Sequence, residues 1–254
     1  NRTPIRYIRL GFAAKGDLAD CRYLAADRQP VDNRDGVAGH AYGHDDAGRL
    51  IAKAHIDTAG RPTGDRHGIA KVGYRYDAEG GMTGLALYNI EGQPQQLATR
   101  GFAAITWTLD GDGRRVKAAF AGPDDRFSRM RPGGYTFAEY SYDTRGNRTR
   151  SLYRGLGGKP VERKDTGAAE VRRSFDPDGR IVEVAWFGEY GQPVLVKGID
   201  AARAVSTYDA RGHETGTAWF DIDGKPILAG PWGAARVARR FDDAGHVLEE
   251  AWFG

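Results

Sequence analysis

A five-residue segment of the form aromatic-Asp-x-x-Gly returns every 33 residues, and this period constrains the fold more than any other feature of the chain. It reads FDPDG at 175–179, YDARG at 208–212 and FDDAG at 241–245. Towards the N-terminus the copies, with some substitutions, stand at 142–146, 109–113 and 76–80, and, with one residue removed per step, at 44–48 and 12–16. The pattern predicts about eight tandem copies of one structural unit.

Three further signals keep the same phase. A Trp-Phe pair stands at 186–187, 219–220 and 252–253. A Gly-x-Pro segment recurs at 60–62, 92–94, 158–160, 191–193 and 224–226. A glycine precedes the aromatic-Asp pair by eight residues in most copies, and Asp200 replaces it in one. Four signals in one phase indicate a repeat array over the whole chain.

Each copy is predicted to fold as a β-hairpin. Residues 70, 72, 74 and 76 are apolar or aromatic and the residues between them are Lys71, Gly73 and Arg75, which is the two-residue period of a strand with one buried face. The Asp-x-x-Gly segment is turn chemistry, because Asp caps backbone N–H groups two residues on and Gly accepts positive φ. Proline cannot donate to a strand ladder, so Gly-x-Pro is expected to link one hairpin to the next.

The predicted fold class is all-β, with up to sixteen antiparallel strands and no helix. Because open twisted sheets rarely exceed about ten strands without curling, we expect one curled or spiral sheet. Residues 1–254 are expected to form a single repeat array. The repeat pattern is already running at both ends of the sequence, so we also expect the array to be a fragment of a longer protein.

The repeat signature resembles the tyrosine-aspartate (YD) repeats of the bacterial Rhs family and of the related teneurins and toxin-complex shells. Tyr76-Asp77, Tyr142-Asp143 and Tyr208-Asp209 carry it literally. The resemblance implies a curling hairpin sheet that serves as a shell, stalk or surface element in large secreted or envelope proteins. It therefore predicts a structural or interaction scaffold in a secreted, periplasmic or cell-surface bacterial protein, with a protein or glycan as its partner.

Charge and composition exclude several classes. The chain has 37 Lys and Arg residues against 34 Asp and Glu residues, interleaved along its length, so no nucleic-acid partner is expected. No run of 18 apolar residues occurs, so no membrane span is expected. Cys21 is the single cysteine and stands within an apolar alternation, which is typical of a small core residue.

No catalytic, metal or cofactor site is predicted. His40 and His44 would lie roughly 13 Å apart on a strand, too far to share a zinc ion. The acidic segments at 110–113 and 221–224 lack the further ligands of a calcium loop. No Gly-x-Ser-x-Gly elbow or phosphate-binding loop occurs, so the chain is not expected to be an enzyme.

Trp186, Trp219 and Trp252 hold one repeat position, and they are the candidate ligand-binding residues. Equivalent strands two apart in a sheet lie about 9.5 Å from one another, a spacing at which an exposed row of rings can stack on a glycan or peptide. Val182 and Val184 share a face with Trp186, which favours core packing of the row instead. A ligand-binding repeat module is thus the alternative to a scaffold.

Overall fold

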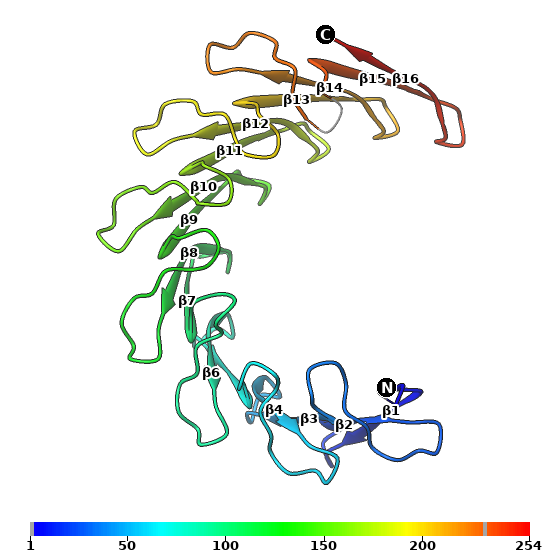
Figure 1. Ribbon diagram of the computed structural model, residues 1–254, viewed down its shortest axis with the longest axis vertical. Coiled ribbons are helices and arrows are strands. Elements are labelled where there is room, and N and C mark those ends of the chain that lie inside the picture. Colours follow the sequence, from blue (N-terminus) through cyan, green and yellow to red (C-terminus); the bar gives the residue numbers. More distant parts are fainter. Residues whose placement is uncertain (1–2, 231–232) are drawn as a thin grey trace. The chain divides into compact units, whose positions relative to one another are not determined.

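The computed structural model describes residues 3–230 and 233–254, which form sixteen strands and, within these ranges, no helix (Figure 1). The strands are β1 (Tyr7–Phe12), β2 (Leu18–Leu24), β3 (Gly39–His44), β4 (Leu50–Ile56), β5 (Lys71–Tyr76), β6 (Met82–Tyr88), β7 (Ala104–Leu109), β8 (Arg115–Ala121), β9 (Phe137–Tyr142), β10 (Arg148–Arg154), β11 (Glu170–Phe175), β12 (Ile181–Phe187), β13 (Arg203–Tyr208), β14 (Glu214–Phe220), β15 (Arg236–Phe241) and β16 (Val247–Phe253).

The strands form one sheet in which spatial order equals sequence order, with β1 and β16 at the ends of that order. The predicted all-β fold of tandem antiparallel hairpins is confirmed. The chain divides into two compact units, one of residues 1–113 and 118–128 and one of residues 114–117 and 129–254. Within each unit the short turns lie at one end of the strands and the long connections lie at the other end (Figure 1).

The short turns contain the Asp-x-x-Gly segments. In the β13–β14 hairpin the Oδ1 atom of Asp209 accepts hydrogen bonds from the backbone N–H groups of Arg211 and His213, both at 2.9 Å. Gly212 has φ of 92°, a conformation that costs glycine little because it has no Cβ. The glycine closing each turn has φ between 76° and 92°: Gly16, Gly48, Gly80, Gly113, Gly146, Gly179, Gly212 and Gly245. Side-chain capping and glycine together fix each hairpin locally.

A bulge follows each turn in the hairpins of β1–β2, β3–β4, β5–β6, β9–β10, β11–β12, β13–β14 and β15–β16. In β13–β14 Thr207 pairs with Gly216 and Tyr208 pairs with Glu214, which leaves Thr215 as the extra residue. A bulge increases the local right-handed twist of the strand pair. The repeat therefore builds the same twist into hairpin after hairpin.

Each long connection folds back on the strand before it. The proline of the Gly-x-Pro segment, or the residue at its place, forms an isolated bridge with the last residue of the preceding strand, as Phe220 does with Pro226 and Ile56 with Pro62. The connection then makes a second turn before the next strand begins. Alanine residues just before the odd-numbered strands are almost fully buried, among them Ala38, Ala103, Ala169 and Ala202. The core thus lies between the sheet and its own connections.

Among the residues that the structure describes, three non-glycine residues have positive φ, and each stands where other copies have glycine. Arg28 (φ 64°) and Asp125 (φ 58°) take the glycine place of Gly-x-Pro. Asp200 (φ 62°) takes the place of the glycine that precedes the aromatic-Asp pair by eight residues. At Asp200 only the residue type differs from the other copies, because the backbone keeps the left-handed conformation that glycine has there.

Candidate functional site

The three candidate tryptophans differ in their exposure. Trp219 on β14 is 5% exposed and packs with Ala201, Ala229, Ala234 and Val237. Trp186 on β12 is partly buried, and Trp252 on β16 is 52% exposed. The row of equal positions in the sequence is accordingly not a row of equally accessible rings in the structure.

The residue eighteen positions earlier determines what fills the space beside each ring. The Phe102 and Phe120 rings lie 5.6 Å apart, and the Tyr135 and Tyr153 rings lie 4.7 Å apart. In the next three copies a tryptophan follows an alanine at that spacing: Ala168 with Trp186, Ala201 with Trp219 and Ala234 with Trp252. Protein interiors are close-packed, so a large ring requires a small neighbour. Trp219 and Ala201 show this exchange of volume, since both lie in one buried cluster.

The same position in the first unit holds a polar cluster. His55 and His40 are directly opposed on β4 and β3, and their ring centroids lie 5.1 Å apart. The Tyr23 hydroxyl and His40 Nε2 share a hydrogen bond of 3.0 Å, and His55 Nδ1 donates to the Ile69 carbonyl at 2.8 Å. Burial, reinforced by Lys53 and His55, lowers the pKa of His40 to about 4. The imidazole of His40 is thus held neutral within the core.

Sequence reasoning compared His40 with His44 and missed this pairing of His40 with His55. The bulge in this hairpin determines the pairing: His44 is opposite Leu50, and the extra residue in β4 places His55, one residue beyond Ala54, opposite His40. Among residues 3–230 and 233–254, no three side chains of His, Cys, Asp or Glu converge in a way that would hold a metal ion. The histidine pair acts here as a packing and hydrogen-bonding element.

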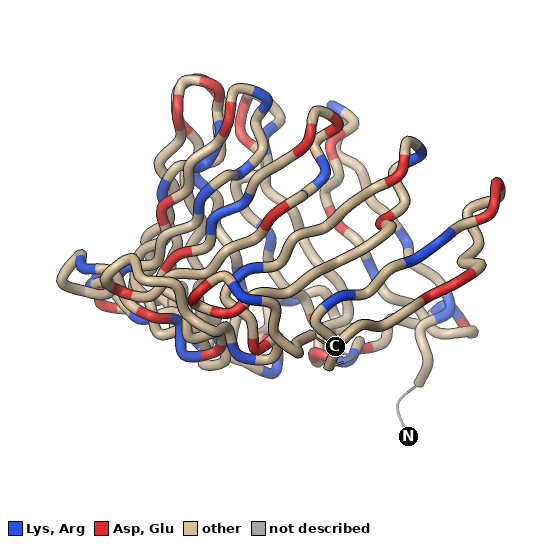
Figure 2. The backbone as a smooth tube through the Cα atoms, turned by 90° about the horizontal axis from the view of Figure 1, so that it is seen from above, with Lys and Arg blue, Asp and Glu red and all other residues tan. Residues whose placement is uncertain are grey.

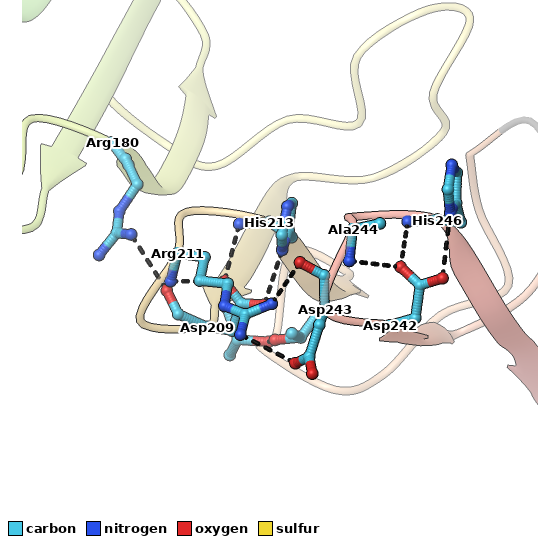
Figure 3. Close-up of polar contacts among 10 residues, drawn as sticks. Arg180, Asp209, Arg211, His213, Asp242, Asp243, Ala244 and His246 are labelled. Carbon is cyan, nitrogen blue, oxygen red and sulfur yellow. Dashed lines mark hydrogen bonds and ion pairs between the residues drawn. The ribbon is translucent and has the colours of Figure 1, made fainter.

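The short turns form a second repeated arrangement, which we call the turn ladder: the Asp of each Asp-x-x-Gly segment, the residue after its Gly, and the aromatic-Asp pair of the next copy. Arg180 is one rung, and its Nε donates to Asp176 Oδ2 at 2.6 Å. One of its terminal nitrogens also donates to the Asp209 carbonyl at 3.2 Å (Figure 3). Its guanidinium lies 5.1 Å from the centre of the Tyr208 ring. A single arginine therefore joins two consecutive turns.

The last rungs use histidine in place of arginine. His213 Nδ1 lies 2.8 Å from Asp209 Oδ2 (Figure 3). The His213 ring stacks on Phe241 with centroids 4.8 Å apart. His246 is bonded in the same way to Asp242 at 3.0 Å. The hydrogen bond from His213 holds the pKa of the Asp209 carboxyl below its usual value. Each carboxylate also accepts two backbone N–H groups, so the Asp-His pairs are turn caps.

The tyrosines of the literal Tyr-Asp copies fasten one hairpin to the one before it. Tyr76 donates its hydroxyl hydrogen to the Leu50 carbonyl at 2.9 Å, and Tyr208 donates to the Ile181 carbonyl at 2.9 Å. Tyr142 makes the equivalent bond to Arg115 at 2.8 Å. Tyrosine, aspartate and glycine of the signature thus each have a structural task in the hairpin array.

In the second unit, many arginines on the sheet form ion pairs with nearby carboxylates. Glu170 is 5% exposed, accepts two 2.8 Å hydrogen bonds from Arg150, and accepts a third from Arg172 at 2.5 Å. The hydrogen bonds from Arg150 hold the pKa of Glu170 below its usual value. Arg154 likewise bonds Glu139 at 2.8 Å. Acidic and basic residues are interspersed along the chain (Figure 2), and these contacts join arginines to carboxylates of the same sheet.

The described residues include no helix long and apolar enough to cross a membrane. No protein-family model matches the sequence, and a search of curated proteins finds no match either.

Comparison with solved structures finds low-identity likenesses over nearly the whole chain. A structure of TcdB2-TccC3-TEV matches at 13% identity with a TM-score of 0.35, covering 96% of this chain and 13% of that one. The Photorhabdus luminescens Tc holotoxin pore matches at 11% identity with a TM-score of 0.32, covering 97% and 15%. A porin-like protein from Bacteroides uniformis matches at 14% identity with a TM-score of 0.27, covering 99% and 96%. The chain thus spans a small part of the toxin chains that it matches.

Proposed function

We propose that this chain is a non-catalytic scaffold of YD-like repeats within a larger bacterial surface or secreted protein. The observation that carries the proposal is the task of the signature residues: the tyrosine binds the preceding hairpin, the aspartate caps the turn, and the glycine closes it. Each hairpin needs these three residues for its own structure. Their recurrence is therefore explained without any role in binding a substrate. The proposed compartment is extracytoplasmic, as the resemblance to secreted repeat proteins implies.

A scaffold made of repeats tolerates the loss of a whole repeat. Deleting residues 170–202 removes one 33-residue period and joins Ala169 to Arg203, which occupies the place of Glu170. Because each repeat contacts only its neighbours, we expect the shortened chain to keep its strand signal in circular dichroism and a cooperative unfolding transition. A matched control deletes residues 170–185, which breaks the phase and should disrupt the hairpins next to the junction, with a loss of strand signal that the in-phase deletion does not show.

The proposal also requires that purified protein turns over no substrate. Loss of the fold after the in-phase deletion, or a hydrolytic activity that copurifies with the chain and disappears on changing one side chain, would contradict the scaffold.

Ligand binding through the aromatic row is the second candidate function, and the exposure of Trp252 favours it. Its ring is open to solvent on β16 next to the exposed Phe253, whereas Trp219 is enclosed. A glycan or peptide array probed with the wild-type chain and with Trp252→Ala tests this candidate. A signal that Trp252→Ala abolishes while the fold persists would support a binding module over a passive scaffold.

A further inference from the structure

The first unit has a groove on one face of its sheet, and all the residues that line it belong to that unit. Its floor is a row of directly opposed small residues that crosses four strands: Ala52 on β4, Gly73 on β5, Ala86 on β6 and Ala104 on β7. The hollow above this row has a volume of about 480 Å³. A volume of this size is typical of sites that bind small molecules or a few residues of a peptide.

The corresponding row of the second unit is filled by charged side chains. It consists of Arg150, Arg172, Ala185 and Arg203 on β10 to β13. Arg150 and Arg172 both donate hydrogen bonds to Glu170. Arg203 donates to Glu183 at 3.2 Å. In the second unit the chain therefore supplies both the cations and the anions of this face.

In the first unit the strands around the groove supply cations only. The strands β3 to β7 contain no Asp or Glu residue. Lys71 and Arg75 line the groove from β5, on either side of Gly73, and both side chains are exposed. Among the residues that the structure describes, neither cation has an ion-pair partner. This part of the face therefore lacks the anions that the second unit contains.

Both cations lean from β5 over β6. Lys71 Nζ lies 4.7 Å from the centre of the Tyr88 ring, and Tyr88 is directly opposite Lys71. Arg75 Nε lies 3.7 Å from the place that a Cβ on Gly84 would take. Tyr88 and Gly84 are the residues two places after and two places before Ala86, on the same face of β6. The two cations thus flank Ala86, which is in the floor of the groove.

The second unit shows which ligand group suits a cation placed in this way. The Arg172 guanidinium lies 4.0 Å from the centre of the Phe187 ring, as Lys71 lies on Tyr88, and it also bonds the Glu170 carboxylate. Hydrogen bonds between a cation and a carboxylate are about twice as strong as those between neutral groups. Charge complementarity therefore favours the carboxylate of a Glu side chain as the missing partner.

We propose that the groove binds an extended acidic peptide segment, with its carboxylates held by Lys71 and Arg75. In an extended peptide, alternate side chains project to the same side about 7 Å apart. A Glu-x-Glu segment can thus place one carboxylate on each side of Ala86. The site is separate from the tryptophan row, which lies in the second unit, and the proposal does not depend on the scaffold function.

One acidic residue does line the groove, but it lies outside the strands. Asp125 belongs to the connection after β8, three strands after β5 in the strand order. Its carboxylate repels other carboxylates near it. The acid groups of a bound peptide are therefore directed towards the β5 side of the groove.

Isothermal titration calorimetry of the 254-residue chain with the blocked peptide acetyl-Glu-Ala-Glu-Ala-Glu-Ala-amide tests the proposal. We expect saturable binding at low ionic strength, and none of the peptide in which Gln replaces each Glu. Lys71→Ala and Arg75→Ala should each weaken binding about tenfold. Arg100→Ala is the matched control, because Arg100 is exposed in the connection before β7 and does not line the groove. It removes the same charge and should bind as the wild type does.

Thr106→Glu supplies the missing carboxylate from the chain itself. Thr106 is exposed on β7, directly opposite Gly84 and therefore close to Arg75. Its equivalent 33 residues later is Glu139, which bonds Arg154 at 2.8 Å. The introduced carboxylate should occupy Arg75 and weaken peptide binding about tenfold without loss of stability.

Circular dichroism and urea unfolding of every variant verify that the fold is kept. The proposal would be overturned by the absence of saturable binding, by equal binding of the Gln peptide, or by equal weakening in Arg100→Ala, which would show an effect of net charge alone. Glucuronate is titrated as a second probe, since it carries a carboxylate without a peptide backbone. Binding of glucuronate but not of the Glu peptide would overturn the peptide as the occupant.

Discussion

The core beneath β3 and β4 and the core beneath β13 and β14 occupy the same place in the repeat and are built from opposite chemistry. The first holds His40 and His55, opposed across the hairpin and hydrogen-bonded to Tyr23 and to a backbone carbonyl. The second holds Trp219 among alanines and Val237. Both support hairpins with the same turn, the same bulge and the same strand lengths.

This difference shows that the hairpin backbone is specified by its turns and that core content is free to vary. A polar core is tolerated where its hydrogen bonds are satisfied, and an apolar core where its volumes match. His40 is the exception within the polar core, because its Nδ1 atom is buried without a hydrogen-bond partner. The two cores should therefore respond differently to substitution and to pH.

The largest expected effect is in the apolar core. Trp219→Ala removes a nearly buried ring and leaves a cavity among small residues that cannot fill it, which should cost about 3–5 kcal/mol of unfolding free energy. Urea unfolding followed by circular dichroism measures the loss. Trp252→Ala is the control at the same repeat position, and its exposed ring should contribute far less. Equal losses in the two variants would contradict the packing difference.

The polar core should be sensitive to acid at a pH where the apolar core is not. The folded-state pKa of His40 is about 4, below the ordinary value of 6.5, so the unfolded chain binds more protons between these values. Stability is fully present above pH 6.5 and falls as the pH drops towards 4, by about 3 kcal/mol at most.

Urea unfolding of the wild type and of His40→Leu, from pH 7 to pH 4.5, measures this contribution. The variant should lose the pH dependence in that window, whereas His246→Leu, in which the replaced histidine is exposed, should keep it. A wild-type unfolding free energy that does not change from pH 7 to pH 4.5 would show that His40 is not held neutral.

A smaller effect is expected where the turn ladder fastens hairpins outside either core. Tyr208→Phe removes the hydroxyl that donates to the Ile181 carbonyl and keeps the ring beneath Arg180, so it should cost about 1 kcal/mol. Tyr76→Phe removes the equivalent bond to Leu50 in the first unit. Similar losses in both variants would show that the ladder is independent of the chemistry of the neighbouring core. A loss of unfolding free energy in only one of the two variants would show that the ladder and the neighbouring core are coupled.

The smallest expected effect is a gain. Arg28→Gly relieves a left-handed backbone at a place where other copies have glycine, and should stabilise the chain by about 0.5–1 kcal/mol. Asp200→Gly should give less, because Asp tolerates this conformation better than Arg does. Thermal unfolding compares the two variants with Gly60→Ala, which places a Cβ on φ of 86° and should destabilise the chain. Destabilisation by Arg28→Gly would mean that the contact of the Arg28 guanidinium with the Tyr7 ring, 5.1 Å from its centre, outweighs the backbone strain.

Local sequence determined much of the fold. Asp-x-x-Gly specifies a turn through its own side-chain caps and its glycine, and the two-residue alternation on either side specifies strands, so the eight hairpins and their order followed from the repeat. The Gly-x-Pro segment was expected between hairpins, and it lies there as a bridge to the preceding strand. The left-handed backbone at Arg28 and Asp200 was not foreseen from residue type, although the repeat phase marks both places.

Only the tertiary structure decided which side chains meet. Trp219 is buried because Ala201, Ala229, Ala234 and Val237 pack around it, and these neighbours cannot be read from the tryptophan position itself. The opposition of His40 and His55 depends on register, and the contact of Glu170 with two arginines depends on the pairing of two strands, β10 and β11. The turns depend on residues that are close in the sequence. Packing and charge pairing depend on residues that are distant in the sequence and become neighbours only when the hairpins pair.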